Sequence, residues 1–166
     1  MNSINLSAIT NSSCDELIGI AVARGCKHYK YYVPGALAVD RPSIPHEMLG
    51  CALLRGPADL DTFHAIRVGA MVLSDAGNSP GAIGAAAVAF GVEGRVAHIA
   101  KLALKVGDQP DFWQAVLAGL PPADDAFEAG FLPGISRFRS ECPITGPGRG
   151  PSLVWLRTAY GRASSK

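Results

Sequence analysis

The sequence predicts a mainly α-helical fold, in which short helical hairpins stack as a bundle or as a small α-solenoid-like array. Three of the prolines within residues 44–120 each open an apolar segment, and proline is favoured in the first turn of a helix. Two segments between them, Leu60–Leu73 and Arg95–Val106, carry apolar residues at helical spacing. From Phe131 onward proline and glycine interrupt the chain, which predicts an irregular arm with at most a short strand pair.

The length and the charge distribution indicate one helical domain followed by a basic arm. A chain of 166 residues falls within the usual size of a single domain. We expect the helical domain over residues 1–130 and the arm, packed on it, over residues 131–166. Residues 135–166 hold six basic residues against Glu141, a local charge of +5, while the whole chain carries only +1. The arm is therefore predicted to be basic and the helical domain to be acidic.

The low content of charged residues predicts a protein partner. Only 17% of the residues are charged and 48% are apolar, whereas an average soluble domain has roughly 25% charged residues. A tight fit to a partner explains such a surface. The longest nearly uncharged run, Asn78–Val92, has about 15 residues, fewer than the ~20 that a membrane-spanning helix needs. The start, Met1–Asn5, lacks the pattern of a signal peptide, so no membrane association is expected.

The cysteines point away from a metal site. The chain has Cys14, Cys26, Cys51 and Cys142, and no two of them stand at the two-residue spacing of a zinc motif. Cys14 and Cys51 fall on the apolar faces of predicted helices, where a thiol behaves as a small hydrophobe. We expect reduced cysteines, a cytoplasmic location and no metal or other cofactor.

The N-terminal third contains two predicted helices. Residues 1–12 are expected to be extended or frayed. Ser13 and Glu16 have the spacing of a capping box, which predicts a helix that Gly25 ends. Ser43 is a candidate N-cap for the helix that opens at Pro45.

The central helices each have their own start or stop signal. Ser79 precedes Pro80, a cap followed by a proline, and Gly107 ends the Arg95–Val106 helix. Pro110 opens the last central helix. The core is expected to hold the large apolar residues of these helices: Phe63, Ile66, Leu73, Val96, Ile99 and Trp113.

A weak internal repeat favours stacked hairpins. The helix-opening prolines recur at intervals of 35 and 30 residues, and an offset of 31 residues lays His64–Leu73 over Arg95–Leu104 with matching apolar positions. Periods of this size with two helices per unit are typical of α-solenoids, but short helices of a plain bundle produce similar spacings. The repeat is loosely similar to the helical hairpins of HEAT and armadillo proteins. That likeness covers residues 44–120 only and has no specific motif.

Two groups of basic residues on predicted helices are candidate binding residues. Arg95, His98, Lys101 and Lys105 recur at steps of three and four residues and so share one side of their helix. Arg67 occupies a similar place one repeat earlier. In stacked hairpins the two groups would form a basic stripe for phosphates or an acidic partner. The plainer interpretation is a solvated helix face.

Two further basic regions are candidates for the same role. Lys27, Tyr29 and Lys30 interleave cations and aromatic rings, an arrangement that can hold phosphates and stack on bases. A buried turn or strand would use the tyrosines equally well. The basic residues of the arm are Arg137, Arg139 and Arg149. Basic, glycine-rich arms bind nucleic acid or a partner groove, and a bland basic tail is the alternative.

No catalytic signature accompanies these candidates. A Gly-x-Ser-x-Gly elbow is absent, and His46-Glu47 is followed at position 50 by glycine instead of the second histidine of a zinc protease. No catalytic residue is predicted. The sequence therefore favours a non-enzymatic helical adaptor or complex subunit, which binds protein and is a candidate for binding DNA or RNA. The alternative is a small enzyme whose site is assembled from scattered His, Cys and Arg residues.

Overall fold

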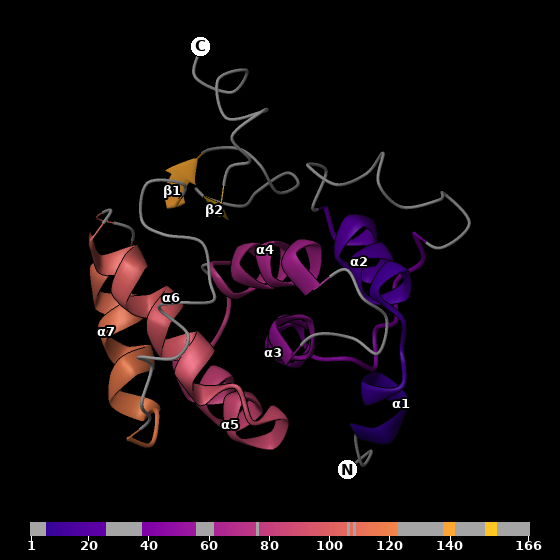
Figure 1. Cartoon of the computed structure of the whole chain (residues 1–166), viewed down its shortest axis with the longest axis horizontal. Coiled ribbons are helices and arrows are strands. Elements are labelled where there is room, and N and C mark those ends of the chain that lie inside the picture. Colours follow the sequence, from indigo (N-terminus) through magenta and orange to yellow (C-terminus); the bar gives the residue numbers. More distant parts are fainter. Residues whose placement is uncertain are drawn as a thin grey trace.

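The structure is a computed structural model that describes residues 6–25, 38–55, 62–75, 77–105, 107, 109–122, 138–141 and 152–155. Within these ranges the chain is mainly α-helical (Figure 1). The helices are α1 (Leu6–Thr10), α2 (Cys14–Ala23), α3 (His46–Arg55), α4 (Thr62–Leu73), α5 (Pro80–Phe90), α6 (Glu93–Lys105) and α7 (Pro110–Gly119). The prediction of a mainly α fold, with helix over most of residues 45–120, is confirmed.

Helix α3 lies at the centre of the helical arrangement. It packs against α1, α2, α4, α5 and α6, with its most extensive contact to α4. Figure 1 shows α3 nearly end-on, with α4 above it, α2 to one side and α5 to the other. Helices α6 and α7 pack together, and α7 also packs on α5. The helices therefore form one packed body around α3.

Glycines set the close approach of α3 and α4. A Cβ atom at Gly69 of α4 would lie 3.0 Å from the carbonyl oxygen of Gly50 in α3. A Cβ at Gly50 would lie 2.5 Å from Leu73 Cδ2. Real Cβ atoms do not pack this closely, because interiors are already filled to crystal-like density. The missing side chains thus bring the two helices together and account for their large contact.

The core consists of the apolar faces of all seven helices. The predicted core residues Ile66, Leu73, Val96, Ile99 and Trp113 are all buried, as the sequence predicts. The side chain of Phe63 lies outside the described part. Cys14 and Cys51 are buried free thiols, which confirms their assignment to apolar helix faces.

The helix caps follow the sequence signals closely. The Ser13 hydroxyl accepts a hydrogen bond from the Glu16 backbone N–H, while the Glu16 carboxylate accepts one from the Ser13 backbone N–H. At α5 the Ser79 hydroxyl accepts a hydrogen bond from the Ala82 backbone N–H. Gly91 ends this helix with φ of 65°, a left-handed conformation that glycine adopts without strain.

The assignment of Ser43 as an N-cap was wrong, because α3 begins at His46 and the Leu49 N–H donates to the Pro45 carbonyl. Helix α6 begins at Glu93, two residues before its predicted start.

The expectation of an extended or frayed N-terminus was wrong over Leu6–Thr10, which forms α1. Ile9 anchors this short helix in the core. The Thr10 hydroxyl donates to the Leu6 carbonyl and the Ser12 hydroxyl donates to the Ala8 carbonyl. A five-residue helix shows no periodicity in the sequence, and it forms here because tertiary packing holds it.

Two short strands complete the described residues. Strands β1 (Phe138–Glu141) and β2 (Ser152–Trp155) pair antiparallel, with Phe138 opposite Trp155. The other residues of the predicted arm lie outside the described ranges.

Candidate functional site

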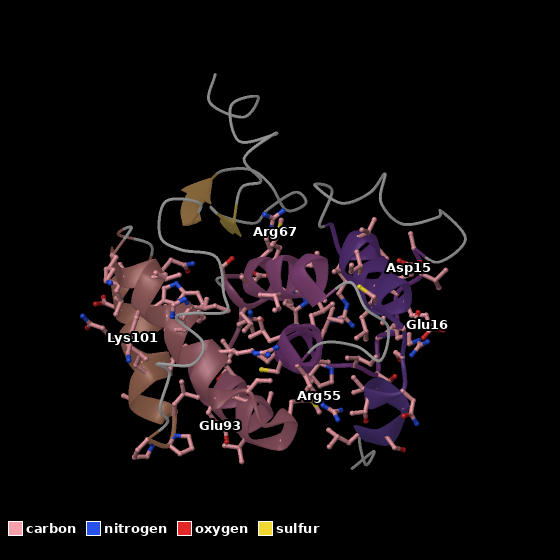
Figure 2. All side chains as sticks on the ribbon, viewed as in Figure 1. Asp15, Glu16, Arg55, Arg67, Glu93 and Lys101 are labelled. Carbon is pink, nitrogen blue, oxygen red and sulfur yellow. The ribbon has the colours of Figure 1, made fainter. Side chains whose placement is uncertain are left out.

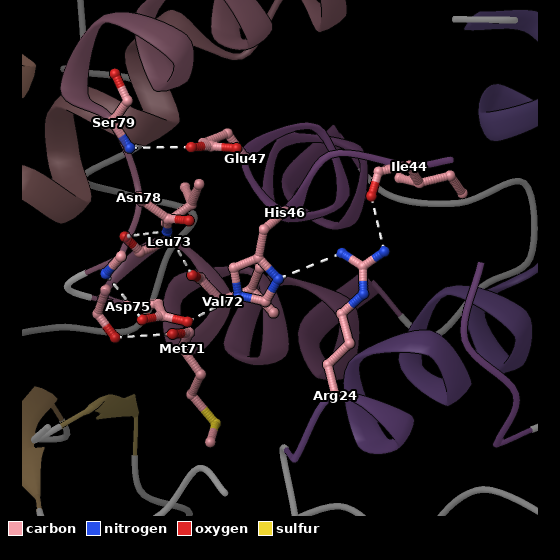
Figure 3. A network of polar contacts seen from close by, with 12 residues as sticks. Arg24, Ile44, His46, Glu47, Met71, Val72, Leu73, Asp75, Asn78 and Ser79 are labelled. Atoms are coloured by element: carbon pink, nitrogen blue, oxygen red, sulfur yellow. Dashed lines mark hydrogen bonds and ion pairs between the residues drawn. The ribbon is translucent and has the colours of Figure 1, made fainter. Parts of the chain in front are cut away.

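A polar network joins three segments that are distant in the sequence (Figure 3). Arg24 follows the last residue of α2, His46 begins α3, and Asp75 lies just after α4. All three side chains are mostly buried, with 12%, 17% and 15% of their surface exposed. We call this set the Arg24–His46–Asp75 network.

Arg24 uses all three guanidinium nitrogens. Its Nε donates to Asp40 Oδ1 at 2.7 Å, and its Nη2 donates to the carbonyls of Arg41 at 2.9 Å and Ile44 at 2.7 Å. Nη1 lies 3.3 Å from His46 Nδ1. A guanidinium presents its donors in a fixed fork, so Arg24 holds the segment before α3 against the end of α2.

The loop between α4 and α5 also contacts His46, through Asp75. Asp75 Oδ2 lies 3.4 Å from His46 Nε2, and its Oδ1 accepts from the Gly77 backbone N–H at 3.0 Å. The amide of Asn78 donates to the carbonyls of Val72 and Leu73 at 2.8 and 3.0 Å, which satisfies the C-terminal end of α4.

Glu47 links α3 directly to α5. Its Oε1 accepts from the Ser79 backbone N–H at 2.9 Å, at the residue that caps α5 (Figure 3). The carboxylate stands at a helix N-terminus, where the helix dipole stabilises a negative charge. The residues around His46 thus join α2, α3, α4 and α5.

The environments of His46 and Cys51 are both mostly closed to solvent. Both nitrogens of the His46 ring face a charged partner, Arg24 on one side and Asp75 on the other. Burial, assisted by the negative charge of Glu47, raises the pKa of the Cys51 thiol to about 12. Its sulfur lies 4.0 Å from the Ile83 carbonyl oxygen. A thiol of this kind stays protonated and is a poor nucleophile, so Cys51 has a packing role.

The predicted basic stripe of α6 divides into two parts. Arg95 Nη1 donates to the carbonyls of Leu54 and Arg55, the last residues of α3. It therefore acts as a C-terminal cap of α3, where positive charge is favourable. Lys101 and Lys105 are exposed, and His98 is half-buried. Figure 2 shows Lys101 projecting outward from the side of α6 and α7.

Arg67 is separated from that stripe. Its side chain is only 7% exposed and points away from α3 on the other side of α4 (Figure 2). Figure 2 shows Lys101 of α6 at a distance from Arg67, on another side of the molecule. The predicted continuity between the two repeats is therefore not visible among the described residues, and the binding role of these residues stays a prediction.

The remaining candidate residues cannot be placed. Lys27, Tyr29, Lys30, Arg137 and Arg149 lie outside the described residues, and Arg139 is described only as a backbone position of β1, opposite Val154.

One surface feature, on α5, was not predicted from the sequence. This helix has no ionisable residue, and one side of it is exposed over Gly81, Ala82, Ala85, Val88 and Ala89. Val88 is 52% exposed. We call these five residues the uncharged α5 face. The available signal was the lack of charge in residues 78–92, which was considered only in relation to membranes.

The described part of the chain contains neither a membrane-spanning helix nor a metal-binding cluster. No helix there is long and apolar enough to cross a bilayer, and no group of three His, Cys, Asp or Glu side chains is placed to hold a metal ion. Comparisons with protein-family models, with curated proteins and with solved structures gave no match.

Proposed function

We propose that the chain is a non-enzymatic helical adaptor or complex subunit that binds a helix of a protein partner through the uncharged α5 face. The observation that carries the proposal is the exposure of five small or apolar residues on a helix without any charge. Their spacing puts them on one side of the helix, opposite the side that Ile83, Ala87 and Phe90 bury in the core.

Small side chains favour a helix as the occupant of this face. A helix can approach another closely where glycine and alanine replace bulky residues, and α5 already accepts α7 in this manner. A Cβ at Gly84 would lie 3.0 Å from the Gly119 carbonyl oxygen. The uncharged α5 face offers the same small residues to a second helix.

Two of the helix contacts are those expected of a stacked hairpin array. Helix α3 packs on α5, and α5 packs on α7, so the first helices of successive repeat units are neighbours in turn. Stacks of this kind present extended surfaces for partners. We include the array in the proposal, with α5 as its middle member.

Nucleic acid is the second part of the proposal, with DNA and RNA both open. Lys101 and Lys105 are exposed at the end of α6 and supply the described positive charge. Lys27, Tyr29, Lys30, Arg137, Arg139 and Arg149 would extend it. A cytoplasmic location belongs to the same proposal, and free buried thiols at Cys14 and Cys51 are compatible with it.

The proposal is tested by capture from the native host with matched variants. Ala85→Glu puts a charge on the uncharged α5 face, while Ala115→Glu puts the same charge on an exposed alanine of α7. Both positions are exposed, so both variants should fold as the wild type. We expect nuclease-treated extract to yield a partner protein that the Ala85→Glu variant loses and the Ala115→Glu variant keeps. Equal capture by both variants would refute the assignment of the face.

The nucleic-acid part has a separate test. Phosphate binding releases counterions, so affinity should fall with salt at a log–log slope near −0.9 per phosphate contact on duplex DNA, or about −0.7 on single strands. Replacing Lys101 and Lys105 by alanine should make that slope shallower by an amount equivalent to the loss of up to about two phosphate contacts. Wild-type protein without salt-sensitive binding to DNA or RNA would remove nucleic acid from the proposal and leave an acidic protein as the partner of the basic residues.

A further inference from the structure

Three segments of the chain meet at the imidazole of His46. Arg24 Nη1, from the end of α2, lies 3.3 Å from His46 Nδ1, and Asp75 Oδ2, from the α4–α5 loop, lies 3.4 Å from His46 Nε2 (Figure 3). The ring contacts both Arg24 and Asp75. Its protonation state therefore bears on the junction of α2, α3 and α4.

The arrangement requires one tautomer of the neutral ring. A guanidinium remains protonated at any physiological pH and can only donate hydrogen bonds. Nδ1 of His46 must therefore accept from Arg24, and the single ring proton is on Nε2. That N–H points to the Asp75 carboxylate, which can only accept. Neutral His46 in the Nε2–H form thus satisfies both neighbours at once.

A second proton on the ring affects the two sides differently. It goes to Nδ1, where it faces the N–H of Arg24, so that two donors meet. Arg24 cannot turn away easily, because Asp40 and the carbonyls of Arg41 and Ile44 hold its other nitrogens. The contact between Nε2–H and Asp75 persists and becomes an ion pair. One contact of the ring is lost while the other is strengthened.

The other charged groups near the ring are accounted for. Asp40 is engaged by Arg24, and Glu47 accepts from the Ser79 N–H. Arg41 directs its guanidinium to Ser12 and Glu16, and Arg67 projects from the other side of α4 (Figure 2). Helices α1 and α5 contain no ionisable residue. None of these groups replaces the Arg24–His46 contact once the ring is protonated.

We propose that His46 is a proton-operated latch at the start of α3: the neutral ring joins the end of α2 to the α4–α5 loop, and protonation breaks the Arg24–His46 contact while Asp75 stays bound. Imidazoles are the side chains that ordinarily change charge between pH 5 and 8, and the proposal is tested at the two ends of that range. Its opening removes the direct contact between the end of α2 and the His46 side chain, while Arg24 keeps its hydrogen bonds to Asp40, Arg41 and Ile44. The latch is independent of the proposed partner binding, since it lies at a different place from the uncharged α5 face.

The test is a pair of double-mutant cycles at pH 8 and pH 5, measured by urea unfolding. The first cycle combines Arg24→Gln with His46→Ala, and the second combines Asp75→Asn with His46→Ala. At pH 8 each pair should show a coupling of about fivefold in the unfolding constant, the size of one hydrogen bond. At pH 5 the Arg24–His46 coupling should fall to a factor of one, which means no interaction, or below one, which means repulsion. The Asp75–His46 coupling should stay at about fivefold or increase.

The second cycle is the matched control, because it probes the same ring from its other side. An Arg24–His46 coupling that is the same at both pH values would overturn the proposal, and so would a parallel loss of both couplings. If a variant does not fold, the wild type still gives an answer. Nitrogen-15 spectra of the imidazoles at pH 8 should show His46 as the Nε2–H tautomer, and the Nδ1–H tautomer would contradict the latch.

Discussion

Single residues without a side chain determine how the two central helices meet. Gly69 in α4 faces the backbone carbonyl of Gly50 in α3, and this neighbour cannot move without moving its helix. Gly81, in α5, has open surroundings, since a Cβ there would meet only Ser79 Oγ at 3.9 Å. Replacing glycine by alanine should therefore have opposite effects on stability at Gly69 and at Gly81.

We expect Gly69→Ala to lower the free energy of unfolding by about 1–3 kcal/mol, the usual effect of overpacking a filled core. Gly81→Ala should leave it unchanged or raise it by up to about 1 kcal/mol, because alanine favours helix over glycine. Urea unfolding of both variants measures the difference. If Gly69→Ala is as stable as Gly81→Ala, α3 and α4 do not approach as closely as described.

Arg95 and Lys101 differ although both belong to the predicted basic stripe. Arg95 caps the carbonyls at the end of α3, whereas Lys101 is exposed. Arg95→Ala should cost about 1–2 kcal/mol of stability, since it removes hydrogen bonds from a charged donor. Lys101→Ala should change stability by no more than about 0.5 kcal/mol. Thermal unfolding of both proteins checks this, and equal small effects would mean that Arg95 is not a cap.

The Cys51 thiol predicts a loss of stability at alkaline pH. Burial, with a smaller contribution from the Glu47 charge, raises its pKa from 9.0 to about 12 in the folded protein. The folded state holds this proton more tightly than the unfolded state, so the stabilisation is complete below pH 9 and is lost as pH rises toward 12. In the Cys51→Ala variant the alkaline slope of the unfolding free energy should be shallower by up to one proton. An unchanged slope would mean that the Cys51 thiol is not buried away from water in the folded protein.

At the scale of the elements, local signals were sufficient for α2 to α7. Capping residues and apolar spacing lie within a few positions of one another, so they identified the helices from Ser13 onward. Helix α1 could not be predicted, because Ile9 holds it through a contact with distant residues. The division of the basic stripe was also hidden, since the role of Arg95 depends on the end of α3.

The capping box gives a prediction at this scale. Ser13→Ala removes the hydroxyl that accepts from the Glu16 N–H, and we expect a loss of about 0.5–2 kcal/mol. Ser43→Ala serves as the control, since Ser43 is exposed and lies three residues before the start of α3, outside the cap position. Chemical unfolding compares the two variants. A loss at Ser43 as large as that at Ser13 would contradict the assignment of the cap.

At the scale of the whole molecule, the candidate sites could not be predicted from sequence. The Arg24–His46–Asp75 network joins residues that are 22 and 29 positions apart, and no spacing rule links them. The residues of the uncharged α5 face can be identified only when it is known which side of α5 is buried. Helices with few charges and many alanines offer no clear stripe to identify that side. Both features arise from the packing around α3.

The most direct test of the central claim is site-specific crosslinking in the native host. A photo-crosslinking amino acid placed at Val88, within the uncharged α5 face, should give a covalent adduct with one protein after nuclease treatment and at high salt. The same amino acid at Ala115, exposed on α7, should give little or no adduct. An adduct at Ala115 but not at Val88, or none at either position, would contradict the proposal that the chain binds a protein partner through α5.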